Sequence, residues 1–188
     1  MPNCDAGLVS VLMSVYNGAP TLEKAAASVL AQTYRDLELI LCDDASTDDT
    51  WRIMQRIAAQ DARVTIFQNK TNLGLGASLN ECLAHAQGAY IARQDADDVS
   101  DSDRIERTMD FLLSSGAPYA ACGVRVFDDT GVWSTRQFPQ KITKHIIAQK
   151  NPFFHPTMLF RRAVLESVNG YSTSPETRRT EDYDLVMR

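Results

Sequence analysis

The sequence predicts an α/β fold in which a mostly parallel central sheet carries helices on both faces. Short apolar runs rich in β-branched residues alternate with amphipathic segments, which gives four strands and three helices before residue 98. Polar residues follow the ends of three of these strands. Strands that are joined through helices lie parallel in one sheet, and such sheets bind ligands beyond the carboxyl ends of their strands.

The first half of the chain supplies these elements in order. Residues 8–15 read LVSVLMSV, a run typical of a buried strand, and Pro20 begins a helix. The pattern then predicts a strand over 37–42, a helix over 49–59, a strand over 64–67, a helix over 77–86 and a strand that starts at residue 89.

The pattern changes beyond residue 98. We expect an amphipathic helix over 101–113, strands over 119–122 and 124–127, a segment 132–137 that pairs or stays irregular, a short helix over 143–149, a strand over 156–160 and a helix over 161–168. A last helix has just begun near residue 181 when the sequence stops at Arg188. We therefore expect the full protein to continue beyond this point.

Composition excludes several classes of protein. The chain has 188 residues, 44% of them hydrophobic, and a net charge of −5, which argues against a nucleic-acid partner. It contains neither an apolar run of about 20 residues nor a secretory signal. The four cysteines, Cys4, Cys42, Cys82 and Cys122, lack zinc-site spacing and are expected to be reduced thiols of a cytosolic protein.

Three carboxylates follow the fourth strand within four positions: Asp95, Asp97 and Asp98. Like charges this close raise the cost of ionising one another. A divalent cation such as Mg²⁺ or Mn²⁺ would relieve that repulsion, because it prefers oxygen ligands. The alternative interpretation is a polar turn with a helix cap.

A second acidic pair, Asp43 and Asp44, follows the second strand. Ser46, Thr47 or Asp48 can cap the next helix. Because one capping residue is enough for this helix, Asp44 remains available to accept hydrogen bonds from a base or a ribose.

Gly74 and Gly76 precede a helix, but they indicate a dinucleotide site only weakly. The full GxGxxG is absent because position 79 is leucine, and the motif normally follows the first strand rather than the third. A plain turn whose backbone can approach a phosphate is the simpler interpretation.

Two further candidates lie near the end of the chain. His155 is either a packed, hydrogen-bonded residue or a neutral imidazole that faces a ligand or metal. Thr180, Glu181 and Asp182 either begin a helix or place a carboxylate in a cleft as a general base.

The segments SVLMSVYNG, ILCDDASTDDT, NLGLGASLN, GAYIARQDADD, HPTMLFRR, GY and TEDYDL, in this order, resemble the family 2 glycosyltransferases of bacterial exopolysaccharide, capsule and lipopolysaccharide synthesis. The resemblance implies the GT-A fold, a nucleotide-diphospho-sugar-binding α/β fold. It implies one catalytic domain over 1–188, truncated at its C-terminus, with a nucleotide-binding half at about 8–98 and an acceptor-side half at about 99–188.

The resemblance also implies roles for individual residues. Asp44 would contact the uracil ring, Asp97 would bind the metal, and Asp182 would be the catalytic base with Glu181 nearby. Asp95 would contact the ribose or metal-bound water, and it is a further candidate metal ligand. His155 is also a candidate metal ligand, on the residue argument above rather than on the resemblance. The remaining donor contacts would be Ser14, Val15, Tyr16, Asn17, Asp43, Asn72, Gly74, Arg93, Asp95 and Asp98.

Two positions depart from the family pattern. Many members have arginine where Leu79 stands, so one cationic contact is missing or is supplied by Arg93. Many also have an aromatic residue where Val186 stands, and that residue packs near the acceptor.

The resemblance therefore implies an inverting transferase that depends on Mn²⁺ or Mg²⁺ and moves a sugar from a nucleotide-diphospho-sugar, expected to be a UDP-sugar, to a hydroxyl of a saccharide or lipid-linked glycan. We expect a cytoplasmic enzyme at the inner membrane face, attached peripherally through the missing C-terminal region. One alternative is a nucleotidyltransferase-like enzyme, but this class has a Gly-, Arg- or Lys-rich phosphate loop where the chain has Tyr-Asn-Gly-Ala-Pro20. Another is a non-catalytic sugar-nucleotide-binding module, which would need Asp44 and Asp97 but not Asp182.

Overall fold

The computed structural model describes residues 7–138, 142, 144–149 and 152–188 of the chain. The predictions for Cys4 and for a helix start at Thr143 lie outside these residues.

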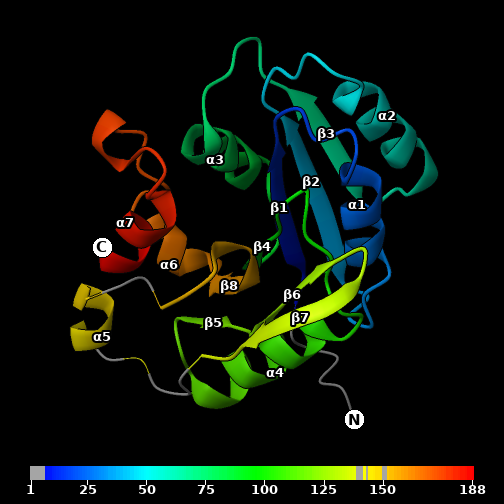
Figure 1. The fold of residues 1–188 in the computed structure, drawn as a ribbon. Helices are drawn as coiled ribbons and strands as arrows, with labels where there is room; N and C mark the ends of the chain where they lie inside the picture. Colours follow the sequence, from blue (N-terminus) through cyan, green and yellow to red (C-terminus); the bar gives the residue numbers. More distant parts are fainter. Residues whose placement is uncertain (1–6, 139–141, 143, 150–151) are drawn as a thin grey trace.

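A six-stranded sheet forms the centre of the molecule (Figure 1). Its order is β3-β2-β1-β4-β8-β5, and β1 to β4 run parallel while β8 is antiparallel to both of its neighbours. The bounds are Val9–Val15 for β1, Leu37–Asp43 for β2, Val64–Gln68 for β3, Tyr90–Arg93 for β4, Tyr119–Ala121 for β5 and Met158–Arg161 for β8. The predicted α/β class and mostly parallel sheet are confirmed.

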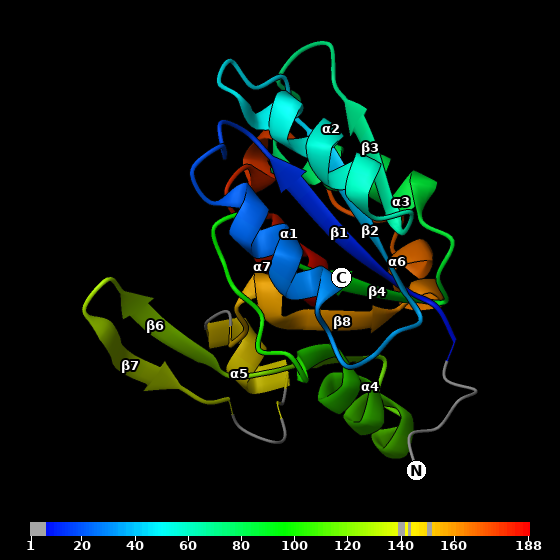
Figure 2. The same cartoon turned by 90° about the vertical axis from the view of Figure 1, so that its right-hand side faces the viewer.

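Helices cover both faces of this sheet, because each strand alternates side chains between two apolar clusters. On one face lie α1 (Leu22–Leu30), α2 (Thr50–Gln60) and α4 (Arg104–Ser115), which pack on Val11 and Met13 of β1. On the other face lie α3 (Leu75–His85), α6 (Arg162–Ser167) and α7 (Glu181–Met187), which pack around Leu12 and Ile40. Figures 1 and 2 show the two layers from perpendicular directions.

The hairpin of β6 (Val124–Asp128) and β7 (Gly131–Arg136) forms a separate two-stranded ribbon. It projects from the body of the molecule in Figure 2. Residues 132–136 of the segment that the sequence left open therefore pair with β6. Lys24 lies over the ring of Phe127, and Arg125 forms an ion pair with Asp101, so the ribbon is tied to α1 and to the chain ahead of α4.

The remaining elements are short. They are α5 (Lys144–Gln149) and two 3-10 turns, η1 (His155–Thr157) and η2 (Pro175–Thr177). The strand predicted from residue 156 begins only at Met158, because the first residues of that segment form η1. Among the described residues, no helix is long and apolar enough to cross a bilayer. Cys42, Cys82 and Cys122 are free thiols.

The parallel register brings three loops to one edge of the sheet. Val15 at the end of β1 lies beside Asp43 at the end of β2, and Leu12 lies beside Arg93 at the end of β4. The residues that follow these strands, Tyr16, Asp44 and Asp95, therefore lie along the edge where ligands bind in such sheets.

Candidate active site

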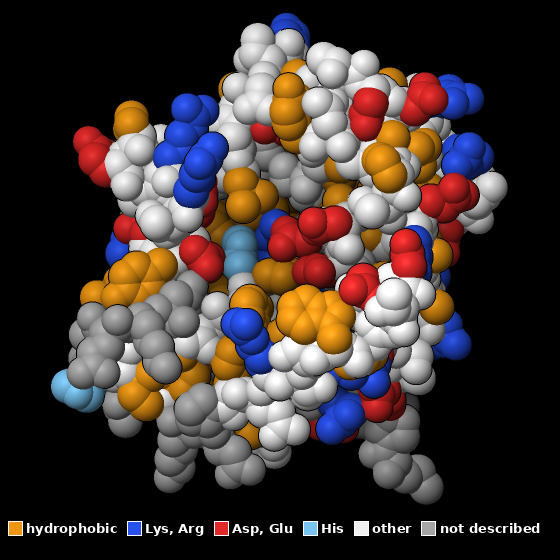
Figure 3. Space-filling view, in the orientation of Figure 1, with side chains coloured by type: hydrophobic (Ala, Val, Ile, Leu, Met, Phe, Trp, Pro, Cys, Tyr) orange, Lys and Arg blue, Asp and Glu red, His pale blue; other side chains and the backbone are white. Residues whose placement is uncertain are grey.

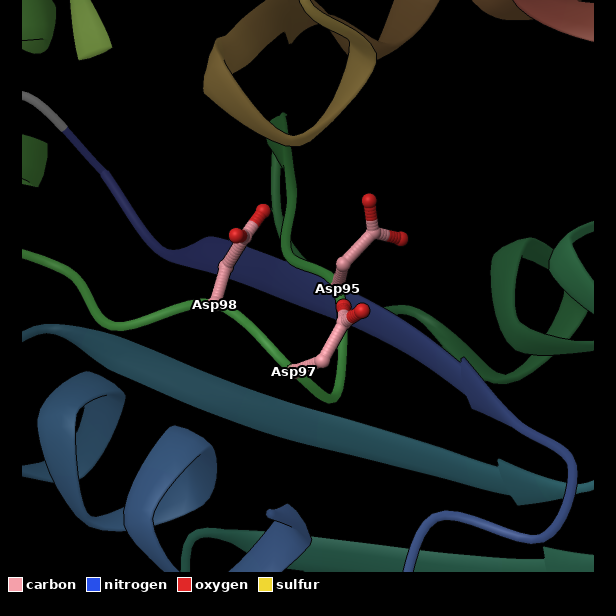
Figure 4. A group of neighbouring side chains, drawn as sticks. All are labelled: Asp95, Asp97 and Asp98. Carbon is pink, nitrogen blue, oxygen red and sulfur yellow. The ribbon is translucent and has the colours of Figure 1, made fainter. Parts of the chain in front are cut away.

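The three acidic residues after β4 form one cluster. One carboxylate oxygen from each of Asp95, Asp97 and Asp98 lies within 4.8 Å of the others, which makes this the one group of three potential metal ligands found among the described residues. Figure 4 shows the three side chains pointing toward a common space from the loop after β4. In Figure 3, acidic side chains gather in a hollow near the centre of this face.

Gln94 fixes the backbone of this acidic loop. Its side chain is buried, and Nε2 donates to the carbonyl oxygens of Asp95 (3.1 Å) and Asp98 (3.0 Å). Its Oε1 accepts a hydrogen bond from Ser100 Oγ at 2.6 Å. A buried amide with three satisfied bonds holds the loop in one conformation. Sequence reasoning missed this residue.

One buried and one partly buried arginine, Arg93 and Arg104, lie within electrostatic range of the carboxylates. Arg93, 1% exposed, donates from Nη2 to Asp95 Oδ1. Arg104 at the start of α4 donates from Nη1 to the carbonyl oxygens of Arg93 (3.0 Å) and Pro156 (2.7 Å), and its burial lowers its pKa. Nε of Arg93, and Nε and Nη2 of Arg104, are buried without a hydrogen-bond partner among the described residues. Both groups therefore offer positive charge to the acidic cluster.

Repulsion within the cluster shows in the pKa of Asp98. Packing of protein around its carboxyl group, and then the charges of Asp95 and Asp97, raise this pKa to about 6. Arg93 and Arg104 act in the opposite direction but do not cancel the effect. Three carboxylates lie near two guanidinium groups, so the cluster retains an excess negative charge, which favours the binding of a cation.

His155 lies outside the carboxylate cluster. Its ring is buried, and Nε2 hydrogen bonds with Tyr171 Oη at 2.9 Å. Burial, with the charge of Arg93 adding to it, holds the pKa of His155 well below its usual range, so the imidazole is neutral. Of the two interpretations of His155, the structure shows the packed, hydrogen-bonded one. A role for His155 as a metal ligand stays a prediction.

Asp44 connects the end of β2 to the turn before α3. It is 3% exposed, and its carboxylate accepts hydrogen bonds from the N–H groups of Leu73 (2.8 Å) and Gly74 (2.9 Å) and from Asn69 Nδ2 (2.9 Å). Asn72 donates to the carbonyl oxygen of Asp44 at 3.3 Å. This carboxylate thus holds the 72–74 turn in place, and its predicted contact with a base would have to share oxygens that these groups already use.

Asp43, the last residue of β2, is fully buried next to Asp44 in the chain. It accepts hydrogen bonds from Ser46 N–H (3.0 Å) and Gln68 Nε2 (2.7 Å), which brace the loop after β2.

The loop after β1 is attached to the same loop after β2. Asn17, at φ 53°, donates from its N–H to Ser46 Oγ (2.8 Å) and accepts from Thr47 N–H (2.8 Å). Of the three cap candidates, Asp48 binds the N–H of Thr50 at the start of α2 (3.0 Å).

The four predicted donor contacts of the first loop occupy different environments. Tyr16 and Asn17 are exposed, whereas Ser14 is partly buried and Val15 belongs to the core. The side chain of Val15 is therefore not open to a ligand, and its carbonyl oxygen accepts the N–H of Asp44 at 2.8 Å.

The two candidate catalytic acids begin α7 but face different surroundings. Glu181, 8% exposed, lines two adjoining cavities of about 240 and 310 Å³ between the start of α3 and segment 172–181. Asp182 is partly buried, and its Oδ1 accepts the N–H of Tyr183 at 2.8 Å. Thr180 does not cap the helix, because its hydroxyl donates to the carbonyl oxygen of Thr177.

The two departures from the family pattern are both accommodated by packing. Leu79 is fully buried in the core, and Val186 packs partly buried against the same cluster. Arg93 is committed to Asp95, whereas Arg178 reaches the start of α3, with Nη2 3.9 Å from the position a Cβ would take at Gly74. Sequence reasoning missed Arg104 and Arg178, since neither belongs to a recognisable short motif. Tyr171 stands in the GY segment of the family resemblance, but sequence reasoning assigned it no role.

The family model for glycosyl transferase family 2 matches residues 10–168. The chain belongs to this family. A glycosyltransferase of Bacillus subtilis (strain 168), EpsE, is 45% identical over 182 residues, which cover 96% of this chain and 66% of the relative. The Escherichia coli enzyme named UDP-Glc:alpha-D-GlcNAc-diphosphoundecaprenol beta-1,3-glucosyltransferase WfaP is 34% identical, over 68% of this chain and 51% of the relative. The chain thus spans only about half to two thirds of these family 2 relatives.

Solved structures confirm the GT-A fold. TarS of S. aureus in complex with UDP superposes with a TM-score of 0.75 at 22% identity, over 95% of this chain and 54% of that one. The mannosyltransferase PcManGT from Pyrobaculum calidifontis, in complex with GDP-Man and Mn²⁺, gives 0.73 at 22% identity, over 94% and 50%. At this level of identity, the likeness establishes the family fold alone.

Proposed function

We propose that this family 2 chain is the catalytic domain of an inverting, divalent-metal-dependent glycosyltransferase that uses a UDP-sugar. The observation that carries the proposal is the convergence of three carboxylates at the carboxyl end of β4. Their oxygens are the ligands that Mg²⁺ and Mn²⁺ prefer, and the excess negative charge of the cluster favours a cation. PcManGT, of the same fold, is described with Mn²⁺.

In this proposal Asp97 and Asp95 would hold the metal, and Asp98 would adjoin it. When bound, the cation would neutralise the charge that develops on the leaving diphosphate. Arg93, which is buried, would keep Asp95 oriented through their ion pair. The loops at 16–17 and 72–74 would position the nucleotide along the same sheet edge.

Asp182 would act as the general base. Its carboxylate would take the proton of the acceptor hydroxyl while that oxygen bonds to the anomeric carbon and the bond from this carbon to the diphosphate breaks. A single displacement of this kind inverts the anomeric configuration. The name of WfaP supports UDP-glucose and a lipid-diphosphate-linked saccharide as the kinds of substrate. Such an acceptor would place the reaction at the cytoplasmic membrane face.

The first test concerns the metal. We expect UDP to bind more tightly with Mn²⁺ than with EDTA. We expect Asp97→Ala to weaken UDP binding in the presence of Mn²⁺ by about tenfold or more, the loss typical of disturbing a metal site. Isothermal titration calorimetry measures both. Asp110→Ala, at an exposed acid of α4, is the matched control. Tight UDP binding that depends neither on the metal nor on Asp97 would refute the assignment of Asp97 as a metal ligand.

The second test concerns the base. Asp182→Asn keeps the size of the side chain but cannot accept a proton, so we expect turnover of UDP-sugar and acceptor to fall by about 10²–10⁴-fold. UDP affinity should stay as in the wild type. The protein is tested at its full length. An unchanged turnover would favour a role for Asp182 in structure alone.

A further inference from the structure

A series of polar side chains connects the acidic loop after β4 (residues 94–98) to the segment that leads into α7. Its members come from separate parts of the chain: Arg104 on α4, His155 on η1, Tyr171 after α6 and Asn80 on α3. His155 and Tyr171 are buried, and Arg104 and Asn80 are partly buried. We call these four residues the polar chain.

Arg104 ties the end of β4 to η1. Its Nη1 donates to the carbonyl oxygen of Arg93, the last residue of β4, at 3.0 Å and to that of Pro156 in η1 at 2.7 Å. Nε and Nη2 of Arg104 are buried, and no group of the described residues accepts a hydrogen bond from them. Leaving such donors unpaired costs free energy. An arginine here is therefore better explained by the two backbones that it holds than by stability alone.

The next link is a hydrogen bond between two buried rings. His155 precedes Pro156 in the chain, and its Nε2 lies 2.9 Å from Oη of Tyr171. The rings pack edge to face, with centroids 5.3 Å apart. Buried hydrogen-bonded groups have few alternative partners, so this bond restricts both rings to one arrangement.

Asn80 holds the backbone of Tyr171 against α3. Its Oδ1 accepts the N–H of Tyr171 at 2.8 Å, and its Nδ2 donates to the carbonyl oxygen of Tyr171 at 2.9 Å. One amide side chain thus pairs with both polar groups of one residue. Gly170 permits this close approach, because a Cβ there would lie 2.5 Å from Oδ1 of Asn80.

Helix α3 also contacts the start of α7. A Cβ at Gly76 would lie 2.8 Å from the carbonyl oxygen of Ser172 and 3.3 Å from Cγ of Glu181. Ser172 follows Tyr171, and Glu181 is the first residue of α7, so both segments lie against the same part of α3. Asp182, the proposed base, comes directly after Glu181.

The phenol of Tyr171 lies within reach of both parts of the proposed site. Burial raises the pKa of Tyr171, and the charges of Asp95 and Asp182 raise it further, although Arg93 acts in the opposite direction. One ring is therefore within electrostatic range of the acidic cluster and of the proposed base.

We propose that the polar chain positions the start of α7, and with it Asp182, relative to the acidic loop. The inference rests on the proposed function, in which Asp97 would hold the metal and Asp182 would be the base. In this arrangement the four residues touch no reacting atom, so they are positioning residues rather than catalytic ones. They would set the distance between the leaving diphosphate and the base, and an error of about 1 Å in such a distance can cost about 10²-fold in rate.

The first readout separates catalysis from donor binding in the protein at its full length. Tyr171→Phe keeps the ring but removes the hydroxyl that bonds to His155. We expect it to lower kcat for transfer from UDP-glucose to GlcNAc-diphosphoundecaprenol, the substrates in the name of WfaP, by about tenfold or more. The affinity for UDP with Mn²⁺ should stay within about twofold. Tyr34→Phe, which loses a hydrogen bond to the carbonyl oxygen of Gly7 ahead of β1, is the matched control and should leave both values unchanged.

The second readout is amide hydrogen exchange, which needs no turnover. Arg104→Lys keeps the charge but cannot donate to both carbonyl oxygens in the same geometry. We expect exchange over 172–184 to become faster by up to about tenfold, although the lost hydrogen bonds lie at β4 and η1. Tyr171→Phe should likewise speed exchange in the acidic loop. The control Arg161→Lys, which also loses hydrogen bonds to two carbonyl oxygens, should alter neither segment.

The outcomes of the two readouts are distinct. A lower kcat with unchanged UDP affinity, together with faster exchange at the remote segment in each variant, supports the inference. An unchanged kcat, equal losses of kcat and UDP affinity, or remote exchange that matches the controls would overturn it. A wild-type protein that neither binds UDP nor transfers sugar would refute the proposed function, and exchange alone would then decide whether the polar chain holds α7 against the acidic loop. If Arg104→Lys does not fold, Tyr171→Phe carries both readouts.

Discussion

Arg93, Arg104 and Gln94 hold a cluster of like charges in place before any ligand arrives. Gln94 fixes the backbone that carries the carboxylates, and the two guanidinium groups lower the electrostatic cost of bringing them together. Such an arrangement costs stability and is typical of a site prepared for a charged ligand. The sequence indicated the carboxylates, because three acids after a strand form a visible pattern. The sequence did not indicate that Gln94 and Arg104 hold these carboxylates in place, because a single glutamine or arginine forms no recognisable motif.

His155 gives the protein a pH-dependent stability. The pKa of His155 is depressed in the folded state. Below about pH 6.5, the imidazole of the unfolded chain therefore binds a proton while that of the folded chain does not, and the free energy of unfolding falls as the pH falls. We expect His155→Gln, which can still reach Tyr171, to remove up to about 1.4 kcal/mol per pH unit of this slope between pH 6.5 and 5. Urea unfolding at several pH values measures it. His85→Gln, at an exposed ring, is the control, and equal slopes in wild type and His155→Gln would contradict the argument.

At the scale of elements, the site consists of loops that hold one another. The loop after β1 bonds to the loop after β2 through Asn17, and the loop after β2 bonds to the turn before α3 through Asp44. A conformational change in one loop must therefore alter the conformation of the loop bonded to it. This coupling suits a nucleotide that contacts all of them.

Asp44→Asn tests this coupling. The amide has one acceptor oxygen in place of two, and its NH₂ would meet backbone donors, so at least one N–H of Leu73 or Gly74 loses its partner. We expect unfolding to require about 1–3 kcal/mol less free energy and the amides of the 72–74 turn to exchange faster. Denaturation and hydrogen exchange measure these effects. Asp49→Asn, at an exposed ion pair, is the control. Unchanged stability and exchange would show that Asp44 does not hold the turn.

Elements with strong periodicity could be predicted from the sequence, and the others could not. The βα alternation up to residue 93 was correct to within a few residues, since apolar runs and amphipathic helices carry their own signals. The separate ribbon of β6 and β7 was missed as an architecture, because pairing partners are set by tertiary contacts. The cavities between α3 and α7 were missed for the same reason, since Gly76 and Glu181 are distant in sequence.

At the scale of the whole molecule, a parallel sheet gathers the proposed functional groups at one edge. The order β3-β2-β1-β4 aligns the carboxyl ends of four parallel strands, and segment 172–181 lies across from the start of α3 near this edge. The family 2 match and the GT-A neighbours agree with this fold. In the proposed function, nucleotide, metal and acceptor would then meet along one hollow.

The most direct test of this account locates the cation. Crystals of the protein grown with UDP and Mn²⁺ are measured at the manganese absorption edge, where anomalous scattering identifies the ion independently of the refined atoms. We predict one strong peak among the carboxylates of residues 95–98, in contact with the diphosphate. A manganese peak bound to the diphosphate but remote from these carboxylates, or a nucleotide bound at the sheet edge with no ion there, would contradict it.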